Sequence, residues 1–242
     1  MMLRAATKFR PERKAFQVAQ TAGFQCAELW LDPALLADSK RIGGMAREFS
    51  FLCVLHFPNR TDLGEESLDQ AVRLYRNVQC HAMVIHQPQF DLYANSLLAL
   101  DSSINLAIEN HVLEPAEFDE WVERSPGLTL DVEHLWKFTL QDSSLDELIT
   151  QVELLVSNHG DRLYHVHLPG YLPGEAEHRP LHHSPQMASE VLNVLAEYSF
   201  EGLVVSEANE EFQNPADLQR DLLFFESWSE GYASARSGSG AA

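Results

Sequence analysis

Short apolar segments alternate with longer amphipathic ones along the whole chain. The short segments are rich in residues that favour buried strands, and they lie at Leu3–Lys8, Cys26–Leu31, Phe51–Phe57, His81–Gln87, Ile104–Glu109, Leu128–Asp131, Leu163–Leu168 and Leu203–Glu207. The longer segments carry apolar residues at helical spacing, at about 11–23, 33–48, 64–79, 92–102, 114–125, 144–158, 184–199 and 215–231. Strict alternation of predicted strands and helices is typical of βα units around a parallel sheet.

Proline positions support several of the helix starts. A polar residue precedes a proline, as in the first turn of many helices, at Asp32-Pro33, Glu114-Pro115, Ser184-Pro185 and Asn214-Pro215. The eight βα units in a chain of 242 residues predict one α/β domain, a (β/α)8 TIM barrel over residues 1–232. Periodicity alone also allows a doubly wound sheet. The low-complexity segment 233–242 is expected to be a disordered tail.

The charge of the chain argues against a nucleic-acid partner. It contains 36 acidic and 17 basic residues, a formal net charge of −19, and such a field repels phosphate backbones. The one basic cluster, from Lys8 to Lys14, is interpreted as a solvated loop and helix start. A small-molecule substrate is therefore the expected partner, and association into a homo-oligomer stays open.

The cysteines and the hydrophobic runs bear on location. Cys26, Cys53 and Cys80 lie in or beside apolar runs and form no CxxC pair. With no signal-peptide pattern at the N-terminus, they indicate reduced thiols in a cytoplasmic protein. No apolar run approaches the roughly 18 residues that span a bilayer, so no membrane association is expected.

Polar residues mark the ends of the last six predicted strands. In a barrel the functional residues lie at the C-terminal ends of the strands, where this sequence has His56, His86, Glu109, Asp131, His167 and Glu207. Imidazole and carboxylate groups are the usual ligands of Zn²⁺, Mn²⁺, Co²⁺ and Fe²⁺. Carboxylates converging on one apolar-walled mouth would repel each other, and a cation removes that cost. The pattern therefore predicts a metal site on the barrel axis.

Several further histidines lie in the window 164–184. His165 and His167 are two residues apart and face the same side of a strand, with His167 nearer the mouth and the better candidate ligand. His165 is open to two interpretations, a group that orients His167 or a core histidine. His178 and His183 are interpreted as bystanders. Glu133 is out of phase with Asp131 and is expected to neighbour the site without lining it.

A family resemblance rests on motifs spread over nearly the whole chain. They are Ala22-Gly23-Phe24 with Ala27-Glu28-Leu29, Ala107-Ile108-Glu109-Asn110, Leu130-Asp131 with His134, His165-Val166-His167, and Phe200-Glu201-Gly202 leading to Ser206-Glu207. In these motifs the chain resembles the xylose isomerase-like barrels, which include endonuclease IV and the sugar 3-epimerases of the tagatose and psicose type.

The resemblance to the epimerases implies a mononuclear site. Glu109, Asp131, His167 and Glu207 match the four ligands that hold one divalent ion in that class. Glu109 and Glu207 also match the acid/base pair that moves a proton on a carbon next to a carbonyl. The first hypothesis is a metal-dependent isomerase or epimerase of a sugar or a related polyol-like molecule.

The resemblance to endonuclease IV implies more ions. His56, His86 and His134 match positions that bind its additional metals, and His182 matches a ligand in its Asp-Arg-His-His-Ser signature. Pro180 stands where that signature has an aspartate ligand. One to three ions per chain are thus implied, and the second hypothesis is a two- or three-metal phosphoesterase. Pro180 also motivates a third hypothesis, a degenerate metal-binding barrel without catalysis.

Aromatic residues follow several of the strand ends. Trp30, Trp136 and Tyr171 are predicted to wall the substrate pocket. Specificity would be set by the loops after the strands, above all 87–93 and 169–183.

Overall fold

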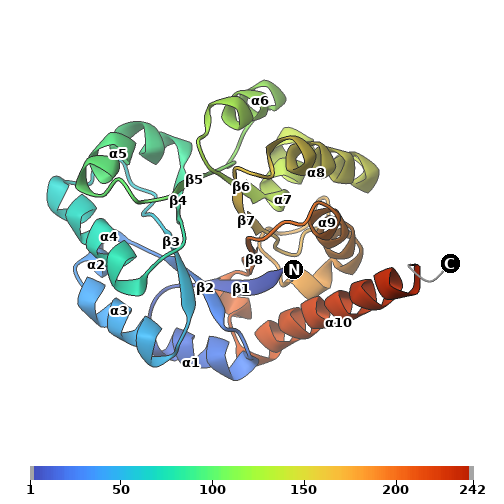
Figure 1. Ribbon diagram of the computed structural model, residues 1–242, viewed down its shortest axis with the longest axis horizontal. Helices are drawn as coiled ribbons and strands as arrows, with labels where there is room; N and C mark the ends of the chain where they lie inside the picture. Colours follow the sequence, from blue (N-terminus) through green and yellow to red (C-terminus); the bar gives the residue numbers. More distant parts are fainter. Residues whose placement is uncertain (1–2, 240–242) are drawn as a thin grey trace.

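Eight parallel strands close into a barrel in the computed structural model of the chain, which describes residues 3–239 (Figure 1). The strands are β1 (Arg4–Phe9), β2 (Cys26–Trp30), β3 (Leu52–His56), β4 (Met83–His86), β5 (Leu106–Glu109), β6 (Leu128–Asp131), β7 (Leu163–His167) and β8 (Leu203–Ser206). Neighbours in the barrel follow chain order, and β8 pairs with β1. The predicted TIM barrel is confirmed, and the doubly wound alternative is excluded.

The helices form a ring outside the strands (Figure 1). They are α1 (Arg13–Ala22), α2 (Pro33–Leu36), α3 (Ser39–Glu48), α4 (Glu65–Val78), α5 (Gln87–Leu100), α6 (Pro115–Arg124), α7 (Val132–His134), α8 (Leu145–His159), α9 (Pro185–Glu197) and α10 (Pro215–Ser239). Short irregular helices are η1 (Leu135–Thr139), η2 (Leu181–His183) and η3 (Glu210–Phe212). The four expected polar-proline starts all begin helices, at α2, α6, α9 and α10.

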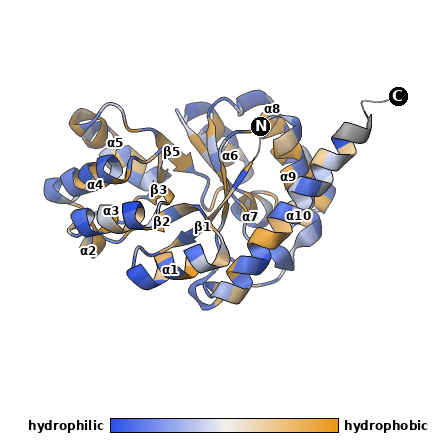
Figure 2. Cartoon of the chain, turned by 60° about the horizontal axis from the view of Figure 1, so that its bottom comes forward, coloured by the Kyte–Doolittle hydropathy of each residue, from blue (hydrophilic) through white to orange (hydrophobic). Residues whose placement is uncertain are grey.

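Two hydrophobic clusters divide the core. The larger lies between the strands and the helices, and the helices contribute many of its apolar residues. Figure 2 shows hydrophobic and hydrophilic residues on the same helices. The smaller fills the barrel and contains Ala6, Cys26, Val54, Ala82, Val84, Ala107, Leu203 and Val205. Most of these residues lie two positions before the polar residue at the end of their strand. Because side chains alternate along a strand, the polar residues point into the barrel mouth.

Two segments differ from the expected secondary structure. Helix α5 begins at Gln87, directly after β4, so segment 87–93 is helical and not a loop. Pro88 occupies its first turn, where the missing N–H of proline costs nothing. Helix α10 continues to Ser239, so residues 233–239 are helical where a disordered tail was expected. The rest of that predicted tail, 240–242, lies outside the described residues.

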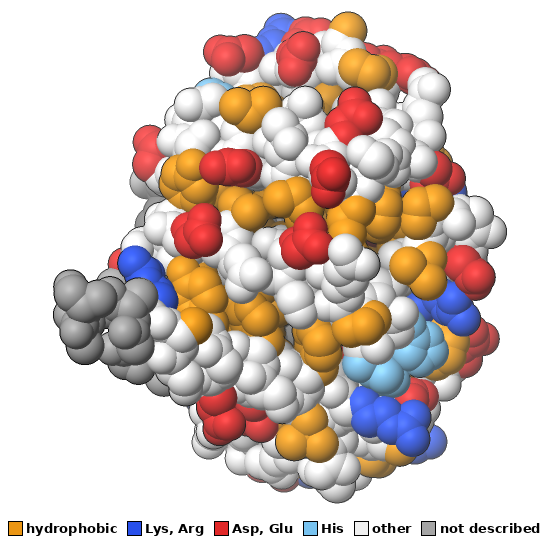
Figure 3. Space-filling view, turned by 90° about the vertical axis from the view of Figure 1, so that its right-hand side faces the viewer, with side chains coloured by type: hydrophobic (Ala, Val, Ile, Leu, Met, Phe, Trp, Pro, Cys, Tyr) orange, Lys and Arg blue, Asp and Glu red, His pale blue; other side chains and the backbone are white. Residues whose placement is uncertain are grey.

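The outer surface and the thiols add two observations. On the face seen in Figure 3, hydrophobic side chains lie among acidic ones. Leu154 on α8 and Leu223 on α10 are exposed hydrophobic residues. The three cysteines are free and buried. Among the described helices, none combines the length and the hydropathy that crossing a membrane requires.

Candidate metal centre

All eight strands bring a polar side chain to the barrel mouth. Strands β3 to β8 supply the six predicted residues, and β1 and β2 add Lys8 and Glu28, which are 8% and 0% exposed. The sequence-based interpretation of Lys8 as part of a solvated basic loop is therefore wrong, because Lys8 is buried in the barrel mouth. The alternation that places Ala6 and Cys26 inside the barrel also places Lys8 and Glu28 there, and this phase was the signal that could have identified both.

Four of the predicted ligands meet on the barrel axis. Glu109, Asp131, His167 and Glu207 each offer one ligand atom, and these atoms all lie within 4.8 Å of one another. His167 Nδ1 is 2.8 Å from Glu207 Oε2, 3.6 Å from Glu109 Oε1 and 3.8 Å from Asp131 Oδ2. We call these four residues the axial group.

Unpartnered buried atoms show that the axial group fits a cation. Asp131 Oδ2, His167 Nδ1 and Glu207 Oε2 are buried without a hydrogen-bond partner. His167 Nδ1 and Glu207 Oε2 are close together but not aligned as a hydrogen bond. Buried polar atoms are costly when they lack partners. One divalent cation between them would satisfy all three, and three carboxylates with one imidazole suit the ions expected from the sequence.

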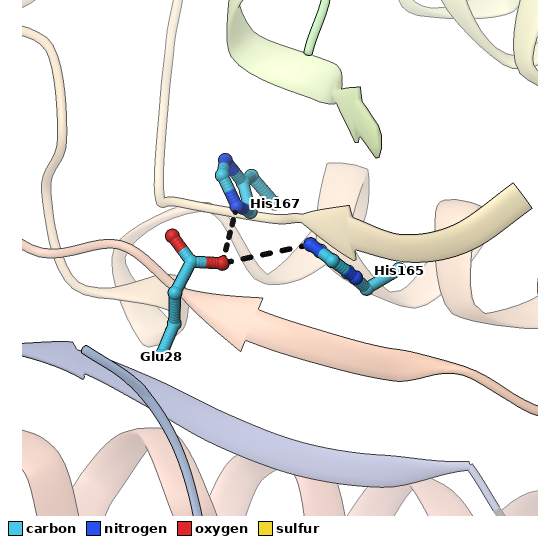
Figure 4. A group of neighbouring side chains, drawn as sticks. All are labelled: Glu28, His165 and His167. Atoms are coloured by element: carbon cyan, nitrogen blue, oxygen red, sulfur yellow. Dashed lines mark hydrogen bonds and ion pairs between the residues drawn. The ribbon is translucent and has the colours of Figure 1, made fainter. Parts of the chain in front are cut away.

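Glu28 orients the imidazole of His167 (Figure 4). The hydrogen bond between His167 Nε2 and Glu28 Oε2 is 2.8 Å long, so the Nε2–H donates to the carboxylate. With a cation bound in place of the second imidazole proton, Nδ1 would direct its lone pair toward the axial group. A carboxylate behind a ligating histidine fixes the tautomer and raises the basicity of the ligand nitrogen.

His165 lies one layer deeper in the barrel. Its Nε2 is 3.1 Å from Thr129 Oγ1. The same atom is 3.7 Å from Glu28 Oε2, the contact drawn in Figure 4. Burial lowers the pKa of His165 to about 3, so this imidazole is neutral. Of the two interpretations left open, a buried core histidine describes these contacts, since the direct contact with His167 Nε2 is made by Glu28.

Lys8 provides fixed positive charge between two of the carboxylates. Its Nζ is 2.5 Å from Glu207 Oε1 and 3.3 Å from Glu28 Oε1. Burial by itself would lower the pKa of Lys8, but the negative charges of Glu207 and Glu28 outweigh it and raise the pKa. The ammonium group is therefore charged at neutral pH.

A second candidate group shares Glu109 with the axial group. His56 Nε2 and His86 Nε2 lie 3.1 and 3.3 Å from Glu109 Oε2, and the three ligand atoms lie within 4.8 Å of one another. The other oxygen of Glu109 faces His167. The carboxylate of Glu109 thus belongs to both candidate groups, with one oxygen facing each.

The electrostatics of the axial group depend on mutual pairing. Burial would raise the pKa of Glu109, but His167 and His86 hold it well below its usual range. Burial would also raise the pKa of Glu207, but the positive charges of Lys8 and His167 hold that pKa well below its usual range. A divalent cation would supply the same charge in place of the proton on His167. Glu133 behaves oppositely, because burial and the charge of Asp131 raise its pKa to about 9.

Backbone contacts fix Asp131 and His134. Asn110 forms two hydrogen bonds with the backbone of Asp131. Its Nδ2 donates to Asp131 O, and its Oδ1 accepts the Asp131 N–H. Asp131 Oδ1 accepts the His134 N–H at 2.8 Å and so caps α7. His134 Nδ1 lies 3.2 Å from Asn110 O and 3.4 Å from Asp131 Oδ2. His134 therefore stands beside the axial group, and the clusters formed by the described ligand atoms do not include it.

His182 is not a member of the clusters formed by the described ligand atoms. Its Nδ1 is 2.6 Å from Asp221 Oδ1, which also accepts its backbone N–H at 3.0 Å. The other oxygen of Asp221 accepts the hydroxyl of Ser206 at 2.5 Å. Asp221 on α10 thus ties the loop after β7 to the end of β8, next to Glu207. Among the described residues, the contacts of His182 with Asp221 attach this loop to helix α10.

Replacing Asp221 by alanine is expected to destabilise the fold by about 1–3 kcal/mol, because buried partners lose their acceptor. The free energy of unfolding in urea measures this change. Glu226→Ala on the exposed face of the same helix is the control and should change it little. Equal stabilities for the two variants would contradict the anchoring role.

A cavity of about 630 Å³ opens beside Glu207. Lys8, Trp30, His178 and Glu207 are among its lining residues, and Trp30 is 38% exposed. Trp136 and Tyr171, also predicted to wall the pocket, are instead buried against each other, with ring centroids 5.9 Å apart. Their polar atoms bond to Ser143 O and Asp142, and neither residue lines this cavity.

Comparison with known proteins adds evidence on the fold. No protein-family model and no curated protein matches the sequence. Among solved structures, a D-tagatose 3-epimerase-like protein superposes with a TM-score of 0.72 at 15% identity, covering 96% of this chain and 99% of that one. An L-ribulose 3-epimerase gives 0.62 at 16% identity, covering 100% and 99%.

Endonuclease IV from Thermus thermophilus is similar to the same extent as the second of these. Its TM-score is 0.62 at 16% identity, with 94% of this chain and 99% of that chain covered. Likeness at these identities is a statement about fold, since one fold supports many activities. The chain shares the (β/α)8 barrel fold of these two epimerase structures and of endonuclease IV.

Proposed function

We propose that the protein is a divalent-metal-dependent isomerase or epimerase of a sugar or a related polyol-like small molecule. The observation that carries this proposal is the axial group, in which four ligand atoms within 4.8 Å leave three buried atoms without partners. Its position at the mouth of a barrel shared with sugar 3-epimerases supports the same reaction class.

The substrate would lie in the cavity beside Glu207. A volume of about 630 Å³ falls in the usual range for small-molecule sites. Trp30 offers an apolar face, and Lys8 offers a charged donor. Arg10 and Lys14 also line this cavity, so its wall is more basic than the chain as a whole. A polyol with several oxygen atoms would find both donors and acceptors here.

Glu109 and Glu207 would carry out the proton transfer. When bound, a divalent cation would polarise a carbonyl group of the substrate. One glutamate then takes a proton from the carbon next to that carbonyl, and the other returns one. Glu207 is 15% exposed in its side chain and lines the cavity, which gives it direct access. Lys8 holds the Glu207 carboxylate in its ionised form, ready to accept a proton.

Deuterium exchange tests this function without a known substrate. The protein, loaded with Mn²⁺, Co²⁺ or Zn²⁺, is incubated in D₂O with D-tagatose, L-ribulose or D-allulose, the sugars named for the structural neighbours. We expect metal-dependent incorporation of deuterium next to the carbonyl of at least one ketose, detected by NMR. The absence of exchange with every sugar and every ion would argue against a ketose epimerase.

A second candidate is a two-metal phosphoesterase. It is favoured by the bridging position of Glu109 between the axial group and His56 with His86, because hydrolases of this type place two ions on opposite sides of one carboxylate. Hydrolysis of bis(p-nitrophenyl) phosphate by the loaded protein, without deuterium exchange into ketoses, would favour this candidate. The degenerate barrel has less support, since Pro180 lies outside both candidate groups.

We also place the protein in the cytoplasm as part of this proposal. Three buried free thiols without a disulfide support a reducing compartment.

A further inference from the structure

Glu133, Glu177 and His178 form a cluster of ligand atoms outside both candidate groups described above. Glu133 belongs to α7, and Glu177 and His178 belong to the loop between β7 and η2. One ligand atom from each lies within 4.8 Å of the other two. We propose that these three residues bind a divalent cation at a separate site, the loop site.

Unpartnered buried atoms point to a ligand at the loop site. Glu133 is 1% exposed, yet its Oε1 has no hydrogen-bond partner, and the buried Nδ1 of His178 also lacks one. Glu133 Oε2 and His178 Nδ1 are 3.7 Å apart. The unpaired Oε1 belongs to the same carboxyl group whose Oε2 lies near the unpaired Nδ1 of His178. Buried polar atoms without partners cost free energy, and a cation that displaces the proton of this carboxyl group would satisfy both.

The backbone around the loop site is held in place. Glu133 Oε2 accepts the His178 N–H at 2.9 Å, and His178 O accepts the Asn209 N–H at 2.7 Å. Asn209 Nδ2 donates to Glu177 O at 3.0 Å. His178 has a φ of 55°, a left-handed conformation that non-glycine residues adopt at a cost. These contacts hold the carboxyl group of Glu133 and the backbone of Glu177 and His178 in place without a cation.

Lys137 is compatible with a cation at this site. Its Nζ forms an ion pair with Glu177, which neutralises part of the negative charge of the cluster. The same Nζ lies 5.4 Å from the ring centroid of Phe138 and 5.8 Å from that of Tyr171. If Glu177 coordinates a metal and its ion pair with Lys137 weakens, cation–π attraction to the two rings would still stabilise the ammonium group.

The loop site differs from the third metal position implied by the family resemblance. The ligands of the additional ions in that family match His134, His182, which bonds to Asp221, and the residue at 180, which is a proline. None of the three belongs to the loop site, although the ring centroids of His134 and His178 are 5.8 Å apart. Three protein donors leave coordination positions open for water. Because His178 and Glu207 line the same cavity, an ion here would lie at the rim of that cavity.

Titration with Mn²⁺ separates the loop site from the axial group. Isothermal calorimetry on the metal-stripped protein is compared for wild type, Glu133→Gln, His178→Ala and Asp131→Asn. Glu175→Gln is the control, because Glu175 is an exposed carboxylate on the same loop that bonds to Arg179. We expect Glu133→Gln and His178→Ala each to weaken one binding event at least tenfold while the axial event persists. Asp131→Asn should weaken the axial event and leave the loop event.

Three outcomes would overturn the loop site. The first is an unchanged number and affinity of Mn²⁺ ions in both Glu133→Gln and His178→Ala. The second is an equal weakening of all binding events in these variants, which would mean that no separate site exists. The third is an anomalous scattering map of crystals soaked in Mn²⁺ with no peak between Glu133 and His178. None of these results depends on whether the protein exchanges protons on ketoses.

Discussion

Replacing Glu109 or Glu207 by glutamine is expected to lower turnover by about 10²- to 10⁴-fold, the contribution of a positioned acid or base. Glutamine keeps the shape of the side chain and can still offer an oxygen, but it cannot take up the substrate proton. Turnover of whichever ketose shows deuterium exchange, measured with saturating metal, gives the size of the loss. The expectation rests on the two carboxylates that meet His167 on the barrel axis.

The two variants should differ in metal content. Glu109 contacts His56 and His86 with one oxygen and faces His167 with the other, so Glu109→Gln should reduce binding at both candidate groups. Glu207 belongs to the axial group alone, and Glu207→Gln should affect one. Elemental analysis after dialysis distinguishes them, with Glu175→Gln as the neutral control. Unchanged turnover in both variants would show that Glu109 and Glu207 are not the acid/base pair.

Much of the site could be predicted because a barrel strand has a simple geometry. Each strand ends at the mouth, and its side chains alternate between the inside and the outside. A polar residue two positions after a buried small one, such as Glu109 after Ala107, therefore faces the axis. This rule requires no knowledge of loops. It predicted that six residues from distant parts of the chain meet at the barrel mouth, as the structure shows.

The same alternation holds for the first two strands, whose polar residues the sequence-based prediction does not include. Lys8 follows Ala6, and Glu28 follows Cys26, in the phase that leads from Ala107 to Glu109. Lys8 also stands in a run of basic residues, and such runs usually lie at the surface. The ion pairs of Lys8 with Glu28 and Glu207 join β1 to its two neighbours, β2 and the end of β8. Pairing between neighbouring strands cannot be predicted from the sequence of one strand.

Loop positions lie beyond what periodicity can predict. His178 is a bystander by sequence, and its place beside Glu133 depends on the path of a loop fixed by Asn209. Segment 87–93 was expected to be a loop because His86 ends a strand, yet Pro88 allows α5 to begin at once. Trp136 and Tyr171 pack on each other because the irregular helix η1 after α7 turns Trp136 inward. These details follow from tertiary packing, which overrides local pattern.

Lys8→Met is expected to destabilise the metal-free protein by about 3–5 kcal/mol, the usual cost of removing one partner from a buried ion pair. Methionine fills a similar volume, so the loss reports the charge. The Glu28 and Glu207 carboxylates on either side of β1 would then have less positive charge between them. Urea unfolding in the presence of a chelator measures the change, and the exposed Lys40→Met is the matched control.

A double variant and added metal should each reduce the effect of Lys8→Met. In Lys8→Met with Glu207→Gln, one carboxylate has lost its charge together with its partner, so part of the lost stability should return. Saturating metal should act in the same direction, because a divalent cation in the axial group supplies positive charge next to Glu207. If Lys8→Met were as stable as Lys40→Met, with or without metal, Lys8 would not hold the charge balance of the barrel mouth. The positive charge that offsets Glu28 and Glu207 would then have to come from another group.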